Sequence, residues 1–308
     1  MSEPGVAAMR VVAVVGPTAV GKSALGTALA RELGGEVVNA DSMQLYRGMD
    51  IGTAKITAAE AGSVPHHLLD IWPVTAPASV AEYQKLAREA IDGLLAAGRP
   101  PILVGGSGLY VRSVLDRFEF PGTDPSLRAR LEAELEEVGP GPLHERLAAL
   151  DPDAAARILP SNGRRIVRAL EVVSLTGSFT AALPAQPEPA YPAVYLGLDC
   201  PTEILDRRVE ARVDAMWAAG FVDEVRRLAD EGLREGRTAG RALGYQQLLR
   251  YLDGECTDAA ARDETVRATR RFVRRQRSWF RRDGRVHWLD PTRDDLLDAA
   301  LAIVRRRS

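Results

Sequence analysis

The chain has 308 residues, 46% of them hydrophobic, which is ample for a packed core. No apolar run approaches the length of a membrane span, and the first ten residues lack the pattern of a signal peptide. The two cysteines cannot build a disulfide framework. The formal net charge is only −2, but residues 267–285 are densely basic. We therefore expect a globular cytoplasmic protein without a membrane segment, and the basic stretch favours a polyanionic partner.

Strand-like and helix-like patterns alternate through the first 120 residues. Strands are predicted at Val11–Val15, 36–40, 66–72 and 101–106, and helices at Lys22–Leu33, 79–97 and 108–116. Such alternation is typical of an α/β fold, in which helices cover both faces of a parallel sheet. Ligands of this fold bind at the carboxyl ends of the strands.

The alternation stops near Phe120, and helical patterns follow up to about Gly177. A proline-rich connector, residues 181–192, precedes a new strand that begins at Ala193 and a helix over 201–219. We predict three segments: the first part of the core over 1–120, an all-helical insertion over 121–190, and a return to the core with C-terminal helices over 191–308.

The segment GPTAVGKS between the first strand and the first helix fits the phosphate-binding loop pattern in every fixed place. Its glycines let backbone N–H groups turn toward phosphate oxygens at the positive end of the helix. Lys22 supplies a charge to the terminal phosphate, and the Ser23 hydroxyl is placed to reach Mg²⁺. The residues predicted to bind phosphate are Gly16, Pro17, Thr18, Ala19, Val20, Gly21, Lys22 and Ser23.

The loop does not by itself say whose phosphates it binds. A motor ATPase carries a Mg²⁺-directed aspartate at the end of a later strand, but here the stretch that contains the strand over 101–106 ends in Gly105, Gly106 and Ser107. A small-molecule kinase can instead use a carboxylate after the second strand, where Asp41 lies. Asp41 followed by Ser42 is also a common helix-cap pair, so from these residues both a catalytic and a capping role stay open.

The stretch VVNADSMQLYRGMDIGTAK, residues 37–55, is rich in polar groups just beyond a strand end. Together with GPTAVGKS, PHHLLDI, ILVGGSGLY and GYQQLLRYLDG, it resembles the bacterial tRNA dimethylallyltransferases over about Val11 to Leu289. The resemblance implies a P-loop NTPase-like core and transfer of a dimethylallyl group from dimethylallyl diphosphate to the exocyclic amino group (N⁶) of the adenosine beside the anticodon. It also implies that the loop and Mg²⁺ hold the diphosphate leaving group, and that the protein is a monomer.

The resemblance further implies roles for individual residues. Asp41 is the general base, Ser107 contacts the acceptor nucleotide through its hydroxyl, and Arg212 contacts the diphosphate. Ser107 as a helix cap and Met43 as core packing remain open. Contacts with tRNA are expected from Asp41, Ser42, Met43, Gln44, Ser107, Arg128, Arg164, Arg165, Ile166, Val167, Arg168, Arg241, Gly244, Tyr245 and Gln246.

Two further features have a structural alternative. The arginines of the basic segment either contact phosphates or are simply solvated, with the aromatic residues between them buried in the core, and both alternatives stay open. The arginines are Arg267, Arg270, Arg271, Arg274 and Arg281, and the aromatic residues are Phe272, Trp279 and Phe280. His66 and His67 lack the further spaced ligands of a zinc site, so we expect them to be structural.

Three functions compete on these observations: dimethylallyl transfer to tRNA, isopentenyl transfer to free AMP or ADP as in cytokinin biosynthesis, and a small-molecule kinase. A free nucleotide needs no arm-gripping domain, so the arginine-bearing insertion favours tRNA. The segment 37–55 and the missing later aspartate disfavour the kinase. The sequence therefore favours the tRNA enzyme.

Overall fold

The computed structural model describes residues 10–117, 120–179 and 188–306. The chain divides into two compact units. The first joins Met1–Asp116 to Pro189–Ser308, and the second is Arg117–Glu188. The second unit overlaps the predicted insertion over 121–190, and most of the proline-rich connector lies outside the described residues.

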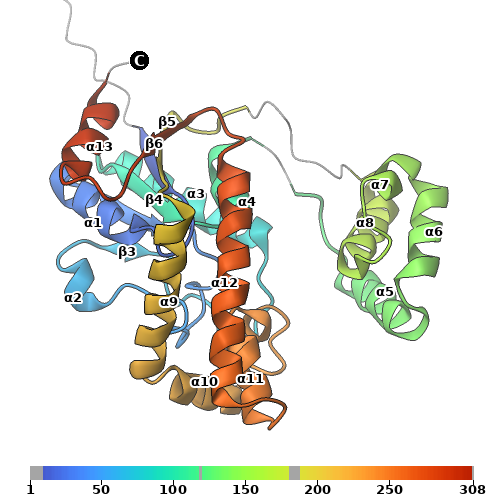
Figure 1. The fold of residues 1–308 in the computed structure, drawn as a ribbon. Helices are drawn as coiled ribbons and strands as arrows, with labels where there is room; N and C mark the ends of the chain where they lie inside the picture. Colours follow the sequence, from blue (N-terminus) through green and yellow to red (C-terminus); the bar gives the residue numbers. More distant parts are fainter. Residues whose placement is uncertain (1–9, 118–119, 180–187, 307–308) are drawn as a thin grey trace, which may run out of the picture. The chain divides into compact units, whose positions relative to one another are not determined.

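A six-stranded sheet forms the centre of the first unit, in the order β3-β2-β4-β1-β5-β6 (Figure 1). Every neighbouring pair is parallel; Val14 of the central strand lies opposite Val104 on one side and Leu196 on the other. The predicted parallel sheet is thus confirmed. The strands are β1 (Val11–Val15), β2 (Glu36–Asn39), β3 (His66–His67), β4 (Pro101–Gly105), β5 (Ala193–Leu198) and β6 (Val286–Leu289).

Alternate residues of β1 face two separate hydrophobic clusters, because successive side chains of a strand point to opposite faces. Val12 and Val14 pack in a cluster with α1 (Lys22–Leu33), α9 (Thr202–Ala218) and α13 (Leu296–Arg305). Val11, Ala13 and Val15 pack in the other cluster with α3 (Val80–Ala96) and α4 (Gly108–Leu115). Helices therefore cover both faces of the sheet, and the predicted fold class is confirmed.

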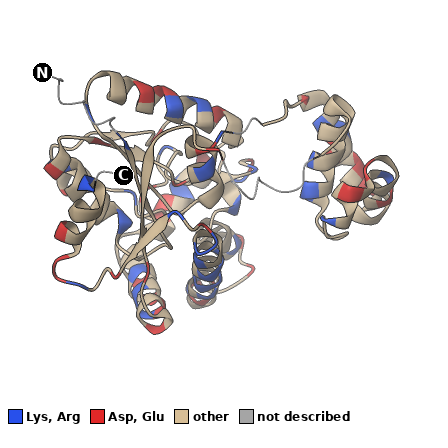
Figure 2. Ribbon diagram, turned by 90° about the horizontal axis from the view of Figure 1, so that it is seen from above, with Lys and Arg blue, Asp and Glu red and all other residues tan. Residues whose placement is uncertain are grey.

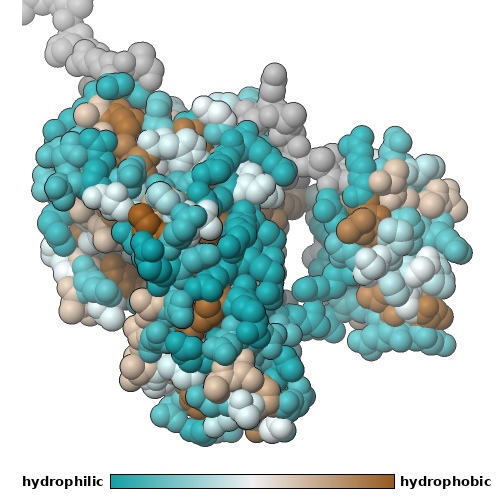
Figure 3. Space-filling view, in the orientation of Figure 1, coloured by the Kyte–Doolittle hydropathy of each residue, from teal (hydrophilic) through white to brown (hydrophobic). Residues whose placement is uncertain are grey.

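The remaining helices of the first unit frame the carboxyl edge of the sheet. They are α2 (Ala58–Ala61), α10 (Phe221–Asp230), the 3₁₀ helix η1 (Ala239–Arg241), α11 (Tyr245–Leu252) and α12 (Asp258–Phe280). Helix α12 lies beside α9, with Arg274 donating to Asp206 at 3.0 Å and Arg270 to Glu210 at 2.8 Å. Figure 2 shows it nearly end-on, with many positions of its own ribbon coloured as basic residues, and Figure 3 shows a largely hydrophilic surface over α9 and α12.

The second unit has a hydrophobic cluster of its own, built by α5 (Pro125–Val138), α6 (Pro140–Leu150), α7 (Pro152–Ala156) and α8 (Gly163–Thr176). Ile166 and Val167 lie inside this cluster. Asp124 and Asn162 begin α5 and α8 by accepting backbone N–H groups, at 2.9 Å from Ser126 and 3.3 Å from Arg165.

Two predictions made from local sequence patterns are confirmed, and a third is wrong. Helix α1 has the predicted bounds, and Ser79 caps α3 by accepting the Glu82 N–H at 3.3 Å. The strand predicted over 66–72 was too long. Leu68 and Asp70 adopt left-handed φ values of 62° and 58°, which end β3 after His67.

No described helix combines the length and apolar character needed to cross a bilayer. Cys200 and Cys256 are both free.

Candidate active site

The loop from Gly16 to Ser23 joins β1 to α1 and depends on two glycines. Gly16 has φ 141°, and a Cβ there would lie 2.4 Å from the carbonyl oxygen of Leu198. Gly21 has φ 104° and is the N-cap of α1. The loop can therefore turn its N–H groups inward at the start of a helix, which is the geometry that binds phosphate oxygens.

Lys22 lies at the base of this loop. Its Nζ donates to the carbonyl oxygen of Pro17 at 2.6 Å. Burial lowers the pKa of Lys22 to about 8, Asp41 opposes this shift, and Arg212 adds to it. The ammonium group is thus held without a direct carboxylate partner among the described residues, so it is available to an incoming anion.

Helix α12 braces the loop through Gln276, which the sequence analysis did not single out. Gln276 accepts the Thr18 N–H at 2.9 Å and donates to the Gly106 carbonyl at 2.9 Å. A Cβ at Gly106 would lie 2.4 Å from the Gln276 amide nitrogen, and one at Gly105 would lie 2.2 Å from the Ala40 carbonyl oxygen. The last residue of β4, Gly105, and the following Gly106 thus leave no room for the carboxylate of a motor ATPase.

Asp41 follows β2 and faces the loop. Its Oδ1 accepts the Met43 N–H at 3.0 Å, and its own N–H donates to the side chain of Asn39 at 2.9 Å. Oδ2 has no hydrogen-bond partner among the residues that the structure describes. One carboxylate oxygen therefore closes a turn, while the other is left for a ligand. The described chain after Asp41 forms a turn and no helix before α2, so the helix-cap alternative is wrong, and the catalytic role stays a prediction.

Ser107 lies next to this turn. Its Oγ is 3.4 Å from the Ser42 backbone nitrogen and 3.3 Å from the Ser42 Oγ. Ser107 occupies the N-cap position of α4, but its side chain makes no cap hydrogen bond. The capping alternative is therefore wrong for this hydroxyl, which points toward Ser42 instead. Met43 is half-buried and packs against the core.

The segment after β2 also supplies carbonyl groups to the site. The Gln44 side chain donates to the carbonyl oxygens of Thr53 at 3.2 Å and Ala54 at 3.3 Å. Arg212, from α9, reaches the Thr53 carbonyl at 3.5 Å and the Thr18 hydroxyl at 3.3 Å. Burial lowers the pKa of Arg212, while Asp41 and Glu60 counteract this shift.

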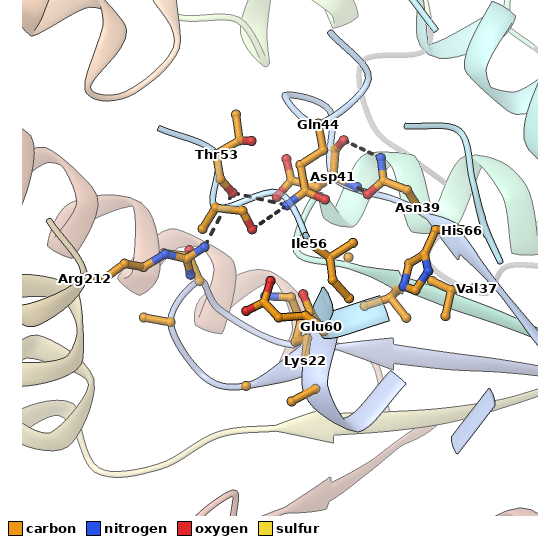
Figure 4. A pocket seen from close by; sticks show the side chains of 18 of the residues that line it. Lys22, Val37, Asn39, Asp41, Gln44, Thr53, Ile56, Glu60, His66 and Arg212 are labelled. Atoms are coloured by element: carbon orange, nitrogen blue, oxygen red, sulfur yellow. Dashed lines mark hydrogen bonds between the residues drawn. The ribbon is translucent and has the colours of Figure 1, made fainter. Parts of the chain in front are cut away.

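These elements enclose a pocket of about 480 Å³ (Figure 4). Lys22, Asp41 and Arg212 come from three different elements and all line it. Its less polar part is lined by Val37, Ile56, Leu69 and Val104. Glu60 and His66 also line it, although sequence analysis gave neither a role here. The pocket thus combines an anion cradle, a carboxylate and an apolar wall.

The family model described as IPP transferase matches residues 44–283 of this chain. The chain belongs to the IPP transferase family. This confirms the resemblance seen in the sequence.

Relatives match over nearly the full length. A tRNA dimethylallyltransferase of Salinispora tropica is 70% identical over 300 residues, covering 97% of this chain and 94% of the relative. One of Streptomyces coelicolor is 67% identical over 303 residues, covering 97% of each. Among solved structures, the tRNA isopentenylpyrophosphate transferase of Bacillus halodurans matches with TM-score 0.71 and 43% identity, over 96% of this chain and 94% of that one. A eukaryotic dimethylallyltransferase acting on tRNA matches with TM-score 0.81 and 26% identity, over 96% and 78%.

Several residues that the IPP transferase resemblance assigns to tRNA contact are buried or paired in the structure. Arg128 and Arg168 both pair with the buried Glu171, the latter at 2.8 Å. Hydrogen bonds from Thr123 and these arginines outweigh the effect of burial and lower the pKa of Glu171 to about 2. Ile166, Val167, Gly244 and Tyr245 are buried, whereas Arg164, Arg165, Arg241 and Gln246 are exposed. Contact of this set with RNA stays a prediction.

Several arginines of the basic helix α12 form ion pairs with acidic residues of the first unit. Arg281 donates to Asp199 at 2.7 Å, and Arg270 and Arg274 pair with acidic residues of α9. The expectation that the aromatics are buried holds for Phe280, at 4% exposure, and is wrong for Trp279, at 39%. One side of the Trp279 indole nevertheless lies directly against Gly108, where a Cβ would be 2.0 Å from the ring nitrogen.

The two adjacent histidines make structural contacts. The His66 Nδ1 lies 2.9 Å from the Val64 carbonyl, and the His67 Nε2 lies 2.6 Å from the Glu36 carboxylate. Within the described ranges, no group of three or more His, Cys, Asp or Glu side chains is arranged to hold a metal ion.

Proposed function

We propose that the chain transfers the dimethylallyl group of dimethylallyl diphosphate to N⁶ of the adenosine that follows the anticodon in tRNA, releasing diphosphate. The curated relatives named tRNA dimethylallyltransferase support this activity. The observation that carries it is the convergence of a phosphate loop and the open Oδ2 of Asp41 on one pocket. A kinase could use both the loop and this carboxylate, so the apolar lining of the pocket and the names of the relatives are what favour alkylation of a weak nucleophile.

The diphosphate is bound as a leaving group. The backbone N–H groups from Thr18 to Ser23, the Lys22 ammonium and the Arg212 guanidinium neutralise the charge that develops as the C–O bond breaks. The apolar wall of the pocket suits the dimethylallyl tail. Water is kept away from the allylic carbon by the same wall, which limits hydrolysis of the donor.

Asp41 acts as the general base. The lone pair of the adenosine amino group is delocalised into the ring, so the nitrogen becomes a good nucleophile only as its proton departs. The new N–C bond forms, one amino proton passes to Asp41 Oδ2, and the diphosphate leaves with the electron pair of the C–O bond. Ser107 and Ser42, with hydroxyls 3.3 Å apart, are placed to hydrogen-bond the acceptor nucleotide.

The residues present fit a magnesium ion. Mg²⁺ usually keeps substrate phosphates and water among its ligands and needs few from the protein, so a single hydroxyl beside the diphosphate suits it. Ser23, exposed at the start of α1, would hold it together with the diphosphate. When bound, Mg²⁺ supplies additional positive charge to the leaving group.

The helical insertion would grip the anticodon arm, with exposed Arg164 and Arg165 of α8 as phosphate contacts. The target adenosine must leave its stack to reach a base beside Asp41. Ser42, Met43 and Gln44 would line its path. We further propose that the enzyme works as a monomer in the cytoplasm, where its tRNA substrate is made.

The experiment is a transfer assay with radiolabelled dimethylallyl diphosphate and Mg²⁺, without ATP, offering unmodified tRNA and free AMP as separate acceptors. Label in tRNA alone is the expected result. Label in AMP would move the chain to the class that prenylates free nucleotides. No label in either acceptor, with ATP consumed in the presence of a small alcohol or acid, would refute the proposal in favour of a kinase.

A further inference from the structure

A buried carboxylate lies behind the pocket, in contact with neither the phosphate loop nor Asp41. Glu224, on α10, is 6% exposed. Its Oε2 accepts the N–H groups of Asp50 at 3.1 Å and Ile51 at 2.7 Å. Its Oε1 accepts the Gly52 N–H at 3.2 Å and the Tyr245 hydroxyl at 2.6 Å. Consecutive backbone N–H groups that converge on one anion form a rigid, charge-assisted cradle.

The rings beside Glu224 leave the loop no freedom to move toward α10. A Cβ at Gly52 would lie 2.2 Å from the Phe221 ring and 2.6 Å from the Tyr245 ring. These two rings pack edge to face, with centroids 4.9 Å apart. Burial and the neighbouring Glu224 raise the pKa of Tyr245, so its hydroxyl remains a donor at neutral pH.

The next two residues of the loop face the pocket. The Thr53 carbonyl accepts from both Gln44 and Arg212, and the Ala54 carbonyl accepts from Gln44 (Figure 4). Ala54 adopts φ 45°, a conformation that non-glycine residues rarely hold without support from neighbouring contacts. The N–H groups of 50–52 are thus fixed on one side, and the carbonyls of 53 and 54 hold two pocket side chains on the other.

We propose that Glu224, assisted by Tyr245, is a positioning residue for the transfer reaction: it fixes the loop 50–54 so that the carbonyls of Thr53 and Ala54 hold Arg212 and Gln44 in place for the diphosphate and the acceptor. This inference rests on the proposed function. It also gives Tyr245 a different role from direct RNA contact, since its ring is fully buried. The Thr53 carbonyl at 3.5 Å and the Thr18 hydroxyl at 3.3 Å are two hydrogen-bond acceptors that direct the Arg212 guanidinium into the pocket.

The variant Glu224→Gln tests this, because it keeps the shape but removes the charge and presents an amide donor to backbone donors. With Mg²⁺ and saturating tRNA, KM for dimethylallyl diphosphate should rise ~10- to 100-fold, as expected for loss of hydrogen bonds to a charged group. Asp223→Asn is the matched control, since this carboxylate lies on the same helix with its side chain 79% exposed. It should leave KM unchanged.

A double-mutant cycle separates positioning from general loss of stability. If Glu224 acts through Arg212, then Glu224→Gln should raise KM for the donor by less than about threefold in an Arg212→Ala background. Full additivity of the two substitutions would overturn the inference. So would a Glu224→Gln variant with a lowered melting temperature whose KM and kcat, measured well below that temperature, equal those of the wild type.

A milder variant guards against failure to fold. Tyr245→Phe keeps the ring packing and removes one of the four donors to Glu224, so KM should rise about threefold and show the same coupling to Arg212→Ala. An additive cycle here would also overturn the inference.

Calorimetry with inorganic diphosphate and Mg²⁺ distinguishes failure of the positioning role from failure of the proposed function. A wild-type protein that neither binds diphosphate nor labels tRNA refutes the proposed function, whereas an active wild type with an unaffected Glu224→Gln variant refutes only the positioning role.

Discussion

Replacing Asp41 by asparagine should separate its structural contribution from its chemical one. The side-chain oxygen of asparagine can still accept the Met43 N–H that Oδ1 accepts at 3.0 Å, so the turn keeps its hydrogen bond. Exchanging a charged acceptor for a neutral one changes the free energy of unfolding by about 1 kcal/mol. For a core of this size that corresponds to a melting temperature shift of about 2–4 °C. The amide cannot take a proton, however, so the chemical step should slow by ~10²–10⁴-fold.

The assay is single-turnover transfer to tRNA with enzyme in excess, run beside thermal unfolding of the same preparation. KM for dimethylallyl diphosphate should not rise, because removal of a carboxylate next to the phosphate loop removes repulsion from the site. Asp41→Ala should be as slow and less stable, since it also loses the turn hydrogen bond. A rate constant for Asp41→Asn within a factor of about three of wild type would refute the base assignment.

Three other variants or conditions probe the same site. Gln276→Leu leaves the half-buried Thr18 N–H and the buried Gly106 carbonyl unpaired, so unfolding should show a loss of about 1–3 kcal/mol with weaker diphosphate binding; an unchanged melting temperature would refute the brace. Lys22 is charged below its pKa of about 8 and neutral above it, so calorimetric affinity for diphosphate should fall as pH rises through 8, and Lys22→Ala should abolish that fall. Arg164→Ala should weaken tRNA binding and reduce the slope of log K against log salt by about one; an unaltered slope would make Arg164 a bystander.

Much of the core was predictable because its signals are local. The run Val11–Val15, the glycine spacing of the loop and the apolar period of α1 lie within 23 consecutive residues, and the structure reproduces their bounds. The strand at 66–72 failed for a local reason as well. Left-handed conformations at Leu68 and Asp70, neither of which is glycine, leave no sign in an apolar pattern.

The supporting contacts of the site could not be predicted because they join distant segments. Gln276 reaches the phosphate loop across 258 positions, and Glu224 reaches Gly52 across 172. Glu224 did carry one usable signal. It occupies an apolar position in α10, between Phe221 and Leu228, where a buried charge needs partners. Glu171 is buried in α8 in the same way. A charged residue on the apolar face of a predicted helix was therefore the missed indicator in both units.

The way in which the chain leaves and re-enters the core bears on how such an enzyme could be remodelled. Asp116 forms an antiparallel bridge with Pro189, and the Ala190 N–H donates to the Leu115 carbonyl at 2.7 Å. The segment that leaves the core at Asp116 and the segment that returns at Pro189 are therefore paired like the two strands of a hairpin. The two ends of the insertion thus lie next to each other. A segment with adjoining ends is exchangeable, because replacing it by a short turn changes the loop-closure entropy only slowly with length and leaves the strand order intact. Under the proposed role of the insertion, acceptor size becomes a modular property of this fold, separable from the chemistry of the sheet edge.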